Sequence, residues 1–469
     1  MSEGAKSSEN RTRHKVRYDL YRGHPNMHML PQDEMKTIMS SFLNKSDDKQ
    51  DSWGSYLNYG PNAGDERFRL ALRSFLNRRT KDDDMGRDDS TNNDKLQHND
   101  GCDHELFITN GVSHGLELLC GTCTNPGDEV WVERPTYFLA PKIFESNNLV
   151  VKSLPMMSDR KMNGSEQGEI GKVDIDRLIC MVEEEGVPPP KMMYIIPSYH
   201  NPTGRSMTVD ERKRLASFAL RNGVILVADE VYHLLDWEQK SDGETSSDSG
   251  TSRRPAGIVN FNSRNGMAKD KDRVGCCVSL SSFTKIWGPG IRLGWINAPL
   301  FIIDRLKQYG YIDSQGGVAP FVGRMMTHAI ENNLLDSYLD KLKLEYSERY
   351  DLMCNILRSE PQISILTENY PLKRRGGYFI WVGFPPNINS DDFFKYSLEN
   401  FGVRFMAGTR CDPFALTNEE VVTGSSSIKN CARLCFADLD RDDLEKGTTA
   451  FVEAFQSYMS YSCLAKYLA

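Results

Sequence analysis

The sequence has no long hydrophobic run, and none of its apolar stretches approaches the roughly 18 to 20 residues needed to span a bilayer. Its N-terminus is polar and lacks the apolar centre of a secretory signal. We therefore expect a cytoplasmic protein without a membrane partner. Basic residues are in the minority as well: the net charge of -8 and the pI of about 5.7 argue against nucleic acid as a partner.

The chain also lacks the second cysteine or histidine pair that a zinc site at Cys120 and Cys123 would need. Its 11 cysteines are expected to be reduced thiols in the cytoplasm. The CxxC pair and the neighbouring Cys276 and Cys277 leave a metal or redox site to be considered. The pair falls late in an apolar helical pattern, so we interpret it as buried packing and predict no metal.

The central part of the chain alternates apolar strand patterns with helical ones. Near-continuous apolar strands separated by helices predict an α/β fold with a mostly parallel, seven-stranded-type sheet covered by helices, and ligands in such sheets bind at the carboxyl ends of the strands. The expected strands cover residues 105–109, 129–133, 192–197, 224–229 and 274–280, and the expected helices cover 112–120 and 210–221.

After residue 299 the pattern changes to one typical of a smaller α+β domain. It predicts helices over 333–358 and 390–400, strands over 378–382, 403–406 and 431–436, and a final helix. With 469 residues we expect three parts, which are an N-terminal arm and packing segment (1–50), a large domain (51–300) and a small C-terminal domain (301–469). Three hydrophilic inserts at 80–104, 156–172 and 239–271 are expected to be surface loops.

The stretch SLSSFTKIWGPGIRLGW contains the first candidate functional residue, Lys285. This amine follows a predicted strand, at the edge of the sheet where it could form a Schiff base with an aldehyde. Ser282 and Arg292 flank it with the donors that a phosphate requires. Together the three residues suggest pyridoxal phosphate. A solvated surface lysine is the ordinary alternative, and the glycines miss the GxGxxG spacing of a nucleotide site.

Two further strand ends provide partners for such a cofactor. Gly111, Val112 and Ser113 open a predicted helix, whose free N–H groups and dipole favour a phosphate. Asp229 ends the strand VILVAD, where a carboxylate could keep a pyridine nitrogen protonated. A plain strand-to-helix turn and a capping aspartate are the respective alternatives.

Aromatic and polar residues after other strands complete the set. Tyr232 and Asn201 could each bond the O3' atom of the ring, and Tyr137 could stack on its face, although turn or core roles would also explain them. Arg433 lies within an apolar strand, where a buried charge is costly unless a carboxylate pairs with it. A substrate carboxylate would satisfy it.

Taken together and in this order, these motifs resemble a known family. The segments YGPNAG, ITNGVSHGLELL, RPTYF, PSYHNPTG, VADEVY, SSFTKIWGPGIRLGW, GGYFIW and NCARLCF are similar to those of fold-type I pyridoxal-phosphate enzymes of the class I/II aminotransferase family. The resemblance runs from about residue 20 to the C-terminal helix, outside the inserts. The spacing from Lys285 to Arg292 is similar to that of the aminoadipate/kynurenine aminotransferase group.

The resemblance implies a role for each candidate residue that binds the cofactor. Lys285 would be the Schiff-base lysine and proton carrier. The remaining contacts would be Asp229 to the ring nitrogen, Asn201 and Tyr232 to O3', Tyr137 on the ring face, and Ser113, Ser282, Arg292 and the backbone of Val112 to the phosphate. Val112 stands where the group usually has a small polar side chain, so only its backbone is available.

The same resemblance implies a substrate site and a homodimer. Arg433 would bind the substrate α-carboxylate with Gly23 and Asn201 nearby, and Tyr59 would reach the phosphate of a neighbouring subunit. Arg22 replaces a second glycine that is common there, and the loop containing Arg410 lacks an expected proline and aromatic residue. Our hypothesis is that one of these two arginines selects an acidic or carbonyl-bearing side chain; the alternative is a surface arginine.

The sequence leaves three functions to compare. The first is transfer of an amino group from an L-amino acid to a 2-oxo acid by a ping-pong mechanism. The second is a carbon-sulfur or related lyase on the same scaffold, which would share almost all of these residues. The third is a ligand-sensing regulator, which would carry a DNA-binding domain of about 60 residues or more ahead of the fold, where this chain has only about twenty.

Overall fold

The computed structural model describes residues 16–43, 56–80, 104–157, 170–238, 256–262, 275–369, 374–414 and 427–468. Most of the predicted inserts at 80–104, 156–172 and 239–271 lie outside these ranges. Within the third insert, however, Ile258 and Val259 are buried against the main sheet. The prediction that this whole insert stands apart from the fold is wrong at residues 256–262. The apolar AGIVNF segment packs on the sheet, and Asn262 bonds both main-chain groups of Cys277.

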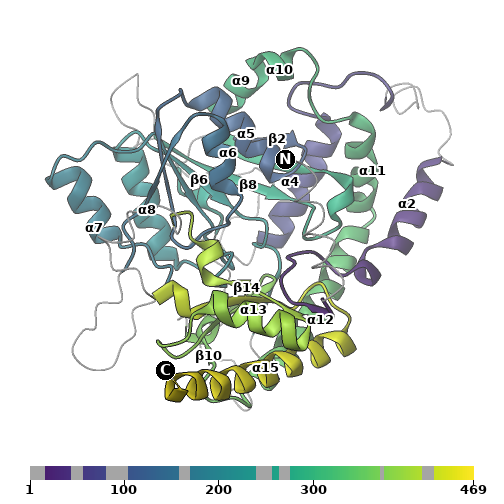
Figure 1. The fold of residues 1–469 in the computed structure, drawn as a ribbon. Coiled ribbons are helices and arrows are strands. Elements are labelled where there is room, and N and C mark those ends of the chain that lie inside the picture. Colours follow the sequence, from purple (N-terminus) through teal and green to yellow (C-terminus); the bar gives the residue numbers. More distant parts are fainter. Residues whose placement is uncertain are drawn as a thin grey trace, which may run out of the picture.

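A seven-stranded sheet forms the centre of the molecule and confirms the predicted α/β fold (Figure 1). The strands β3, β4, β5, β6 and β8 run parallel, and β9 is antiparallel to its neighbours β8 and β2. Across the sheet the order is β2 (His104–Thr109), β9 (Gly294–Pro299), β8 (Cys276–Ser282), β6 (Ile225–Asp229), β5 (Met192–Ile195), β3 (Glu129–Val132) and β4 (Val150–Ser153).

Helices cover both faces of this sheet, which explains why its central strands are apolar throughout. On one face Tyr194, Val227 and Val278 pack against α5 (Val112–Cys123), α6 (Ala140–Ser146) and α9 (Leu300–Gln308). On the other face their strand neighbours pack against α7 (Ile175–Ile179) and α8 (Val209–Arg221). A capping box between Thr208 and Glu211 fixes the start of α8. Cys120 and Cys123 are buried in the first of these layers, as expected for packing residues.

The C-terminal part contains a four-stranded antiparallel sheet, in the order β10 (Ser364–Ile365), β12 (Phe379–Gly383), β15 (Cys431–Cys435) and β14 (Met406–Ala407). Its helices include α12 (Leu334–Leu357), α13 (Ser390–Phe401) and α15 (Arg441–Leu468). The predicted single strand at 403–406 is wrong, because the chain changes partner at the buried Phe405. Residues before it form β13 (Val403–Arg404), which pairs with β1 (Tyr18–Asp19), and residues after it form β14.

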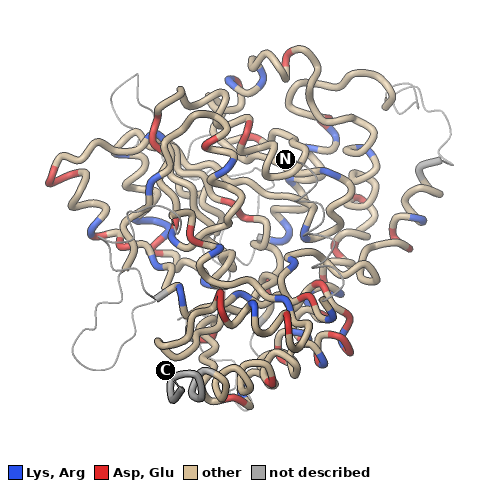
Figure 2. The backbone as a smooth tube through the Cα atoms, viewed as in Figure 1, with Lys and Arg blue, Asp and Glu red and all other residues tan. Residues whose placement is uncertain are grey.

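The remaining elements lie alongside these two sheets (Figure 1). They are α2 (Gln32–Leu43), α4 (Glu66–Thr80), α10 (Gly310–Asp313), α11 (Pro320–Glu331) and a short ribbon of β7 (Asp236–Glu238) with β11 (Arg374–Gly376). Acidic and basic residues are interspersed along the described chain (Figure 2). Within the described ranges, no helix combines the length and apolar composition needed to cross a bilayer. The division at residues 50 and 300 stays a prediction.

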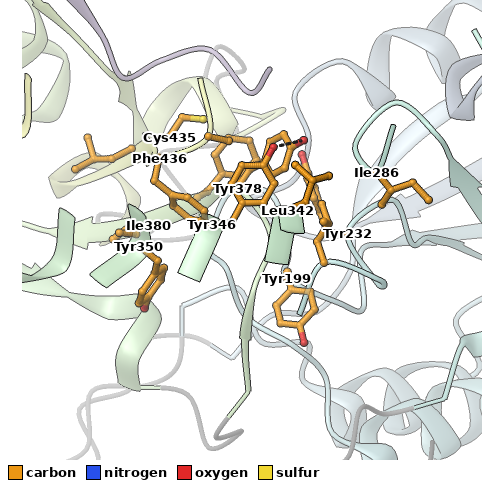
Figure 3. Close-up of a cluster of buried hydrophobic side chains, with 14 of the residues drawn as sticks. Tyr199, Tyr232, Ile286, Leu342, Tyr346, Tyr350, Tyr378, Ile380, Cys435 and Phe436 are labelled. Carbon is orange, nitrogen blue, oxygen red and sulfur yellow. Dashed lines mark hydrogen bonds between the residues drawn. The ribbon is translucent and has the colours of Figure 1, made fainter. Parts of the chain in front are cut away.

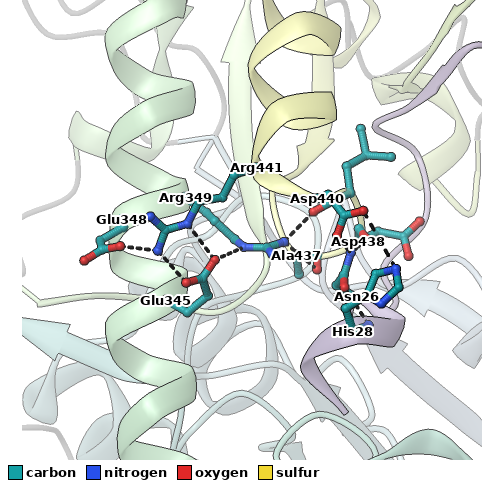
Figure 4. Close-up of polar contacts among 10 residues, drawn as sticks. Asn26, His28, Glu345, Glu348, Arg349, Ala437, Asp438, Asp440 and Arg441 are labelled. Atoms are coloured by element: carbon teal, nitrogen blue, oxygen red, sulfur yellow. Dashed lines mark hydrogen bonds and ion pairs between the residues drawn. The ribbon is translucent and has the colours of Figure 1, made fainter.

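Polar contacts hold the N-terminal segment against the C-terminal part (Figure 4). The side chain of Asn26 donates to the carbonyl oxygen of Asp438 at 2.7 Å and to a carboxylate oxygen of Asp440 at 3.1 Å. Beside them, Glu345 of α12 accepts hydrogen bonds from Arg349 and Arg441. The contacts of Asn26 help to hold the N-terminal segment, whose backbone reaches the site described next.

Candidate active site

The residues predicted at strand ends gather at one edge of the main sheet. Asp229 is the last residue of β6, Ser282 is the last residue of β8, and Gly111 follows β2 at the start of α5. Because β2, β6 and β8 point the same way, their carboxyl ends meet at this edge. Lys285 lies in the turn that follows β8.

The amine of Lys285 is held between a carbonyl group and two aromatic rings. Its Nζ donates to the carbonyl oxygen of Gly23 at 2.6 Å and lies 5.1 Å from the ring centroid of Tyr378 and 5.9 Å from that of Tyr232. Removal from water lowers the pKa of this amine to about 8. About a tenth of this amine is therefore unprotonated at pH 7, far more than for an ordinary lysine, and the unprotonated form is the nucleophile.

Asp229 is a buried carboxylate with only one side-chain partner among the described residues. Its Oδ2 accepts a hydrogen bond from the hydroxyl of Tyr194 at 2.8 Å, while its Oδ1 is buried without a partner in the described chain. Burial raises the pKa of this carboxyl to about 6, against the opposing effects of the Tyr194 bond, of the main-chain N–H of Val231 and of Lys285. An unpaired buried oxygen of this kind is costly and fits a cationic N–H donor.

Arg433 lies at the centre of the small sheet and points toward the main one. It donates to Oδ1 of Asn201 at 2.8 Å and to the carbonyl oxygen of Tyr21 at 2.6 Å, and its guanidinium lies 4.0 Å from the ring centroid of Phe379. Its Nε is buried and has no hydrogen-bond partner among the described residues. Its described hydrogen-bond partners are an amide oxygen and a carbonyl oxygen, neither of which carries a charge, so the guanidinium can still bind an anionic ligand.

The ionisable groups of the site alter one another's pKa values. Asp229 raises and Arg433 lowers the pKa of Lys285. The pKa of Tyr137 is raised mainly by burial, and also by Asp229, with Arg433 acting in the opposite direction. Burial raises the pKa of Tyr232 far above its ordinary value, so its hydroxyl stays protonated. The structure therefore brings together Lys285, Asp229, Arg433 and the two tyrosines.

The turn from β2 into α5 forms a second subsite beside them. Gly111 has a φ of 92° and caps the helix without a side chain, leaving the N–H groups of Val112 and Ser113 without main-chain partners in the described chain. Such a helix start attracts anions. Arg292 donates to the carbonyl oxygen of Asn110 at 2.9 Å, and its guanidinium stays exposed beside this turn.

Close backbone packing fixes that subsite. A Cβ atom on Gly294 would stand 2.7 Å from the carbonyl oxygen of Ser281 and 2.8 Å from the Cα of Gly111, so only glycine fits where β9 passes the turn. Ser282 is buried, and its hydroxyl lies 2.7 Å from that of Thr284 and 3.0 Å from the carbonyl oxygen of Leu293. Its predicted contact with a phosphate is therefore not evident in this geometry and stays a prediction.

Three predicted residues lie away from this cluster. Tyr59 is 80% exposed. Arg22 is exposed and pairs with Asp19 at 3.2 Å, whereas Arg410 packs its guanidinium 4.8 Å from the ring centroid of Phe394. By contrast, the neighbouring Gly23 is in the site: a Cβ there would lie 2.7 Å from the ring of Phe379.

Sequence reasoning missed several contributors to the site. Tyr194 is inside a predicted strand, and its alternation could have placed it on the face toward α6, but nothing in the sequence shows that its hydroxyl reaches Asp229. Phe379 and Tyr378 follow a glycine pair in GGYFIW, where aromatic residues usually indicate core packing. The carbonyl oxygens of Tyr21 and Gly23 carry no sequence signal at all.

The chain is similar to known proteins in sequence and in fold. The profile of the family described as aminotransferase class I and II matches residues 30–451. An uncharacterised protein of Saccharomyces cerevisiae is 24% identical over 94% of this chain and 97% of its own length. The 2-aminoadipate transaminase of Thermus thermophilus is 25% identical over 76% of each chain. The crystal structure of Pyrococcus horikoshii kynurenine aminotransferase, in complex with PMP, has a TM-score of 0.71 at 22% identity, covering 98% of this chain and 95% of the other.

Proposed function

The chain belongs to the class I and II aminotransferase family, and we propose that its reaction takes place between Lys285, Asp229 and Arg433. It is a pyridoxal-phosphate-dependent aminotransferase, which moves an amino group from an L-amino acid to a 2-oxo acid by a ping-pong mechanism. The lyase reaction considered above is not favoured by these relatives. The observation that carries the assignment of the site is the convergence of a desolvated amine, a buried carboxylate and a buried guanidinium at the carboxyl edge of the sheet.

Polar groups of the described residues that lack hydrogen-bond partners match the polar groups of the cofactor. The free Oδ1 of Asp229 matches a protonated ring nitrogen, and the open N–H groups at the start of α5, with Arg292, match a phosphate. When bound, pyridoxal phosphate supplies the aldehyde that takes up the amino group and a ring that withdraws electrons from the α-carbon.

Each charged side chain then has one task. Lys285 holds and moves a proton at its Nζ, for which a pKa of about 8 is well placed near neutral pH. Asp229 supplies a negative charge at its free oxygen, where burial strengthens the interaction with a cation. Arg433 binds the substrate α-carboxylate through its fork of donors, with Asn201 fixing one side of that fork. Tyr137 packs beside the site.

Part of the exposed apolar surface supports a homodimer. Leu57, Tyr59 and Tyr311 are 75%, 80% and 53% exposed. We infer that a second copy of the chain covers this face and that Tyr59 reaches the partner's phosphate subsite, as the family resemblance implies. We further propose that the enzyme works in the cytoplasm on small-molecule substrates.

The small sheet supports a substrate with a large side chain. Trp381 and Met406 are directly opposite Arg433 on its two neighbouring strands, so the three side chains share a face. Phe138 and Tyr21 pack against the same apolar cluster. We infer that this environment suits large, mostly apolar amino acids; the relatives described above are named for 2-aminoadipate and for kynurenine.

The proposal is tested by following the absorption spectrum of the purified, cofactor-loaded protein. Addition of a single L-amino acid should convert the cofactor stoichiometrically to its amine form, and a 2-oxo acid should restore the starting spectrum. Release of ammonia with pyruvate instead would contradict transfer. A screen of donors and acceptors then identifies the substrates.

Arg22→Ala tests whether this residue selects acidic acceptors. The side chain is exposed and shares its charge with Asp19, so we expect a modest effect, a rise in KM of about threefold for a dicarboxylic 2-oxo acid and no change for pyruvate. Steady-state kinetics with both acceptors measure this difference. Identical kinetics for variant and wild type would assign Arg22 to the surface.

Tyr194→Phe should weaken cofactor binding in a pH-dependent way. The hydroxyl stabilises the charged form of Asp229, so its loss should raise the pKa of that carboxyl above about 6 and increase its protonated fraction near neutrality. We expect cofactor affinity to fall about tenfold near pH 6.5 and about threefold or less near pH 8.5, as measured by fluorescence titration. An equal loss at both pH values would contradict this role.

A further inference from the structure

Tyr378 contacts Lys285 at both ends of the lysine. Its hydroxyl donates to the carbonyl oxygen of Lys285 at 2.9 Å, and its ring centroid lies 5.1 Å from Nζ. The side chain is completely buried and packs against Tyr232 at a centroid distance of 5.3 Å. One tyrosine thus contacts both the main chain and the amine of the residue that carries the proposed chemistry.

A second tyrosine fixes the direction of that hydroxyl. Tyr346, on helix α12, donates to the hydroxyl oxygen of Tyr378 at 3.2 Å, as Figure 3 shows. Burial raises the pKa of both tyrosines far above the ordinary value, so both remain protonated donors. With its oxygen accepting from Tyr346, Tyr378 can direct its own proton only outward, to Lys285.

The main chain at Lys285 depends on this contact. The carbonyl group of Lys285 accepts no main-chain hydrogen bond from the described residues. Main-chain N–H groups on either side of it are bonded: Phe283 donates to Leu293, Thr284 to the hydroxyl of Ser282, and Trp287 and Gly288 to Phe283. The hydroxyl of Tyr378 therefore supplies the hydrogen bond at the middle of the turn.

We propose that Tyr378 is a positioning residue for Lys285, which holds the turn through its hydroxyl and the amine through its ring, with Tyr346 orienting the hydroxyl. This inference rests on the proposed role of Lys285. The hydroxyl chain also links helix α12 of the C-terminal part to the turn after β8 of the main sheet. A change in the packing of α12 is thereby transmitted to the lysine.

The test measures how fast the full-length, cofactor-free protein captures pyridoxal phosphate as a function of pH. Tyr378→Leu removes a ring that favours the ammonium form, so the midpoint of the pH profile should fall by about one unit. Tyr378→Phe should leave the midpoint in place and KM unchanged, but lower the rate of capture and kcat about tenfold. Tyr346→Phe should lower the rate of capture and kcat about threefold. The matched control is Tyr350→Phe, a buried tyrosine one turn along α12 that does not contact Lys285.

The outcomes separate this inference from the proposed function. Capture rates and profiles equal to those of the control in all three variants would overturn the positioning role. If the Tyr378 variants fail to fold, the comparison of Tyr346→Phe with Tyr350→Phe decides the question alone. Equal rates of capture in these two variants would overturn the positioning role. If Lys285→Ala still captures the cofactor covalently, the proposed site itself is wrong, whatever the tyrosine variants do.

Discussion

Replacing Lys285 with alanine is expected to abolish the visible absorption of the covalently bound cofactor and to lower kcat by more than about 10⁴-fold. The substitution removes both the amine that attaches the cofactor and the group that moves the proton, and no other described amine stands within the contacts of this site. Absorption spectra of the purified variant and single-turnover kinetics measure the two losses separately.

Lys285→Arg is the matched control, because arginine keeps the positive charge but does not form a Schiff base. It should lose the absorption band as completely as the alanine variant. In the cofactor-free wild type, the rate of capture should rise with pH and level off above about pH 8, where the amine is unprotonated. Retention of the band in Lys285→Ala would mean that another residue binds the cofactor.

The fold was largely predictable because burial on both faces makes the central strands apolar throughout. The strands ending at Asp229 and Ser282 were predicted within two residues of their observed bounds. Strand β4 was missed because it lies at the edge of the sheet, where half of its side chains are exposed and the apolar pattern is weak. The segment at 403–406 was predicted as one strand because sequence alone does not show that the chain changes sheets at Phe405.

The site was predictable to the extent that strand ends converge at one sheet edge. Asp229 was identifiable because it ends an apolar strand at that edge, and Arg433 because a charge within an apolar strand requires a partner. Contacts that depend on the third dimension were not. The hydrogen bond from Tyr194 to Asp229 joins neighbouring strands, and the carbonyl oxygens of Tyr21 and Gly23 come from a segment more than 400 and 250 residues away from their partners, respectively.

Burying charged groups in the site also lowers the free energy of unfolding. A prediction based only on the stability of the core would therefore not place such residues here. The folded protein holds the carboxyl of Asp229 with a raised pKa and the amine of Lys285 with a lowered one, so burial disfavours the charged form of each. Such a conflict between folding and activity is typical of functional sites.

Asp229→Asn is expected to show this conflict directly, by losing activity while gaining stability. Asparagine keeps the size of the side chain and an oxygen for Tyr194, but removes the negative charge at the free oxygen. We expect kcat to fall about 10³-fold. In the cofactor-free variant, the pKa of Lys285 should move below about 8, because the carboxylate raises it in the wild type.

The stability effect depends on pH with a definite sign. The carboxyl of Asp229 has a pKa of about 6 when folded, against an ordinary value of 3.8, so the folded state binds the proton more tightly. The carboxylate therefore costs stability increasingly above pH 3.8 and fully above about pH 6. The free energy of unfolding of cofactor-free Asp229→Asn should therefore exceed that of wild type by about 1 to 3 kcal/mol at pH 7. Near pH 4 the two proteins should have similar free energies of unfolding. Urea unfolding at the two pH values measures this.

Glu230→Gln is the matched control, since Glu230 is the next residue and is also a buried acid. Its carboxylate accepts from the N–H of Ile258 at 2.9 Å and lies 3.7 Å from the guanidinium of Arg212, so its contacts are with the layer around α8. Its charge makes only a minor contribution to the raised pKa of Asp229. Neutralising it removes the carboxylate next to the buried guanidinium of Arg212, and this should reduce stability while kcat stays within about threefold of wild type. Asp229→Asn should thus gain stability and lose activity, whereas Glu230→Gln should lose stability and keep activity. Losses of both stability and activity in both variants would show that Asp229 acts only as part of the core.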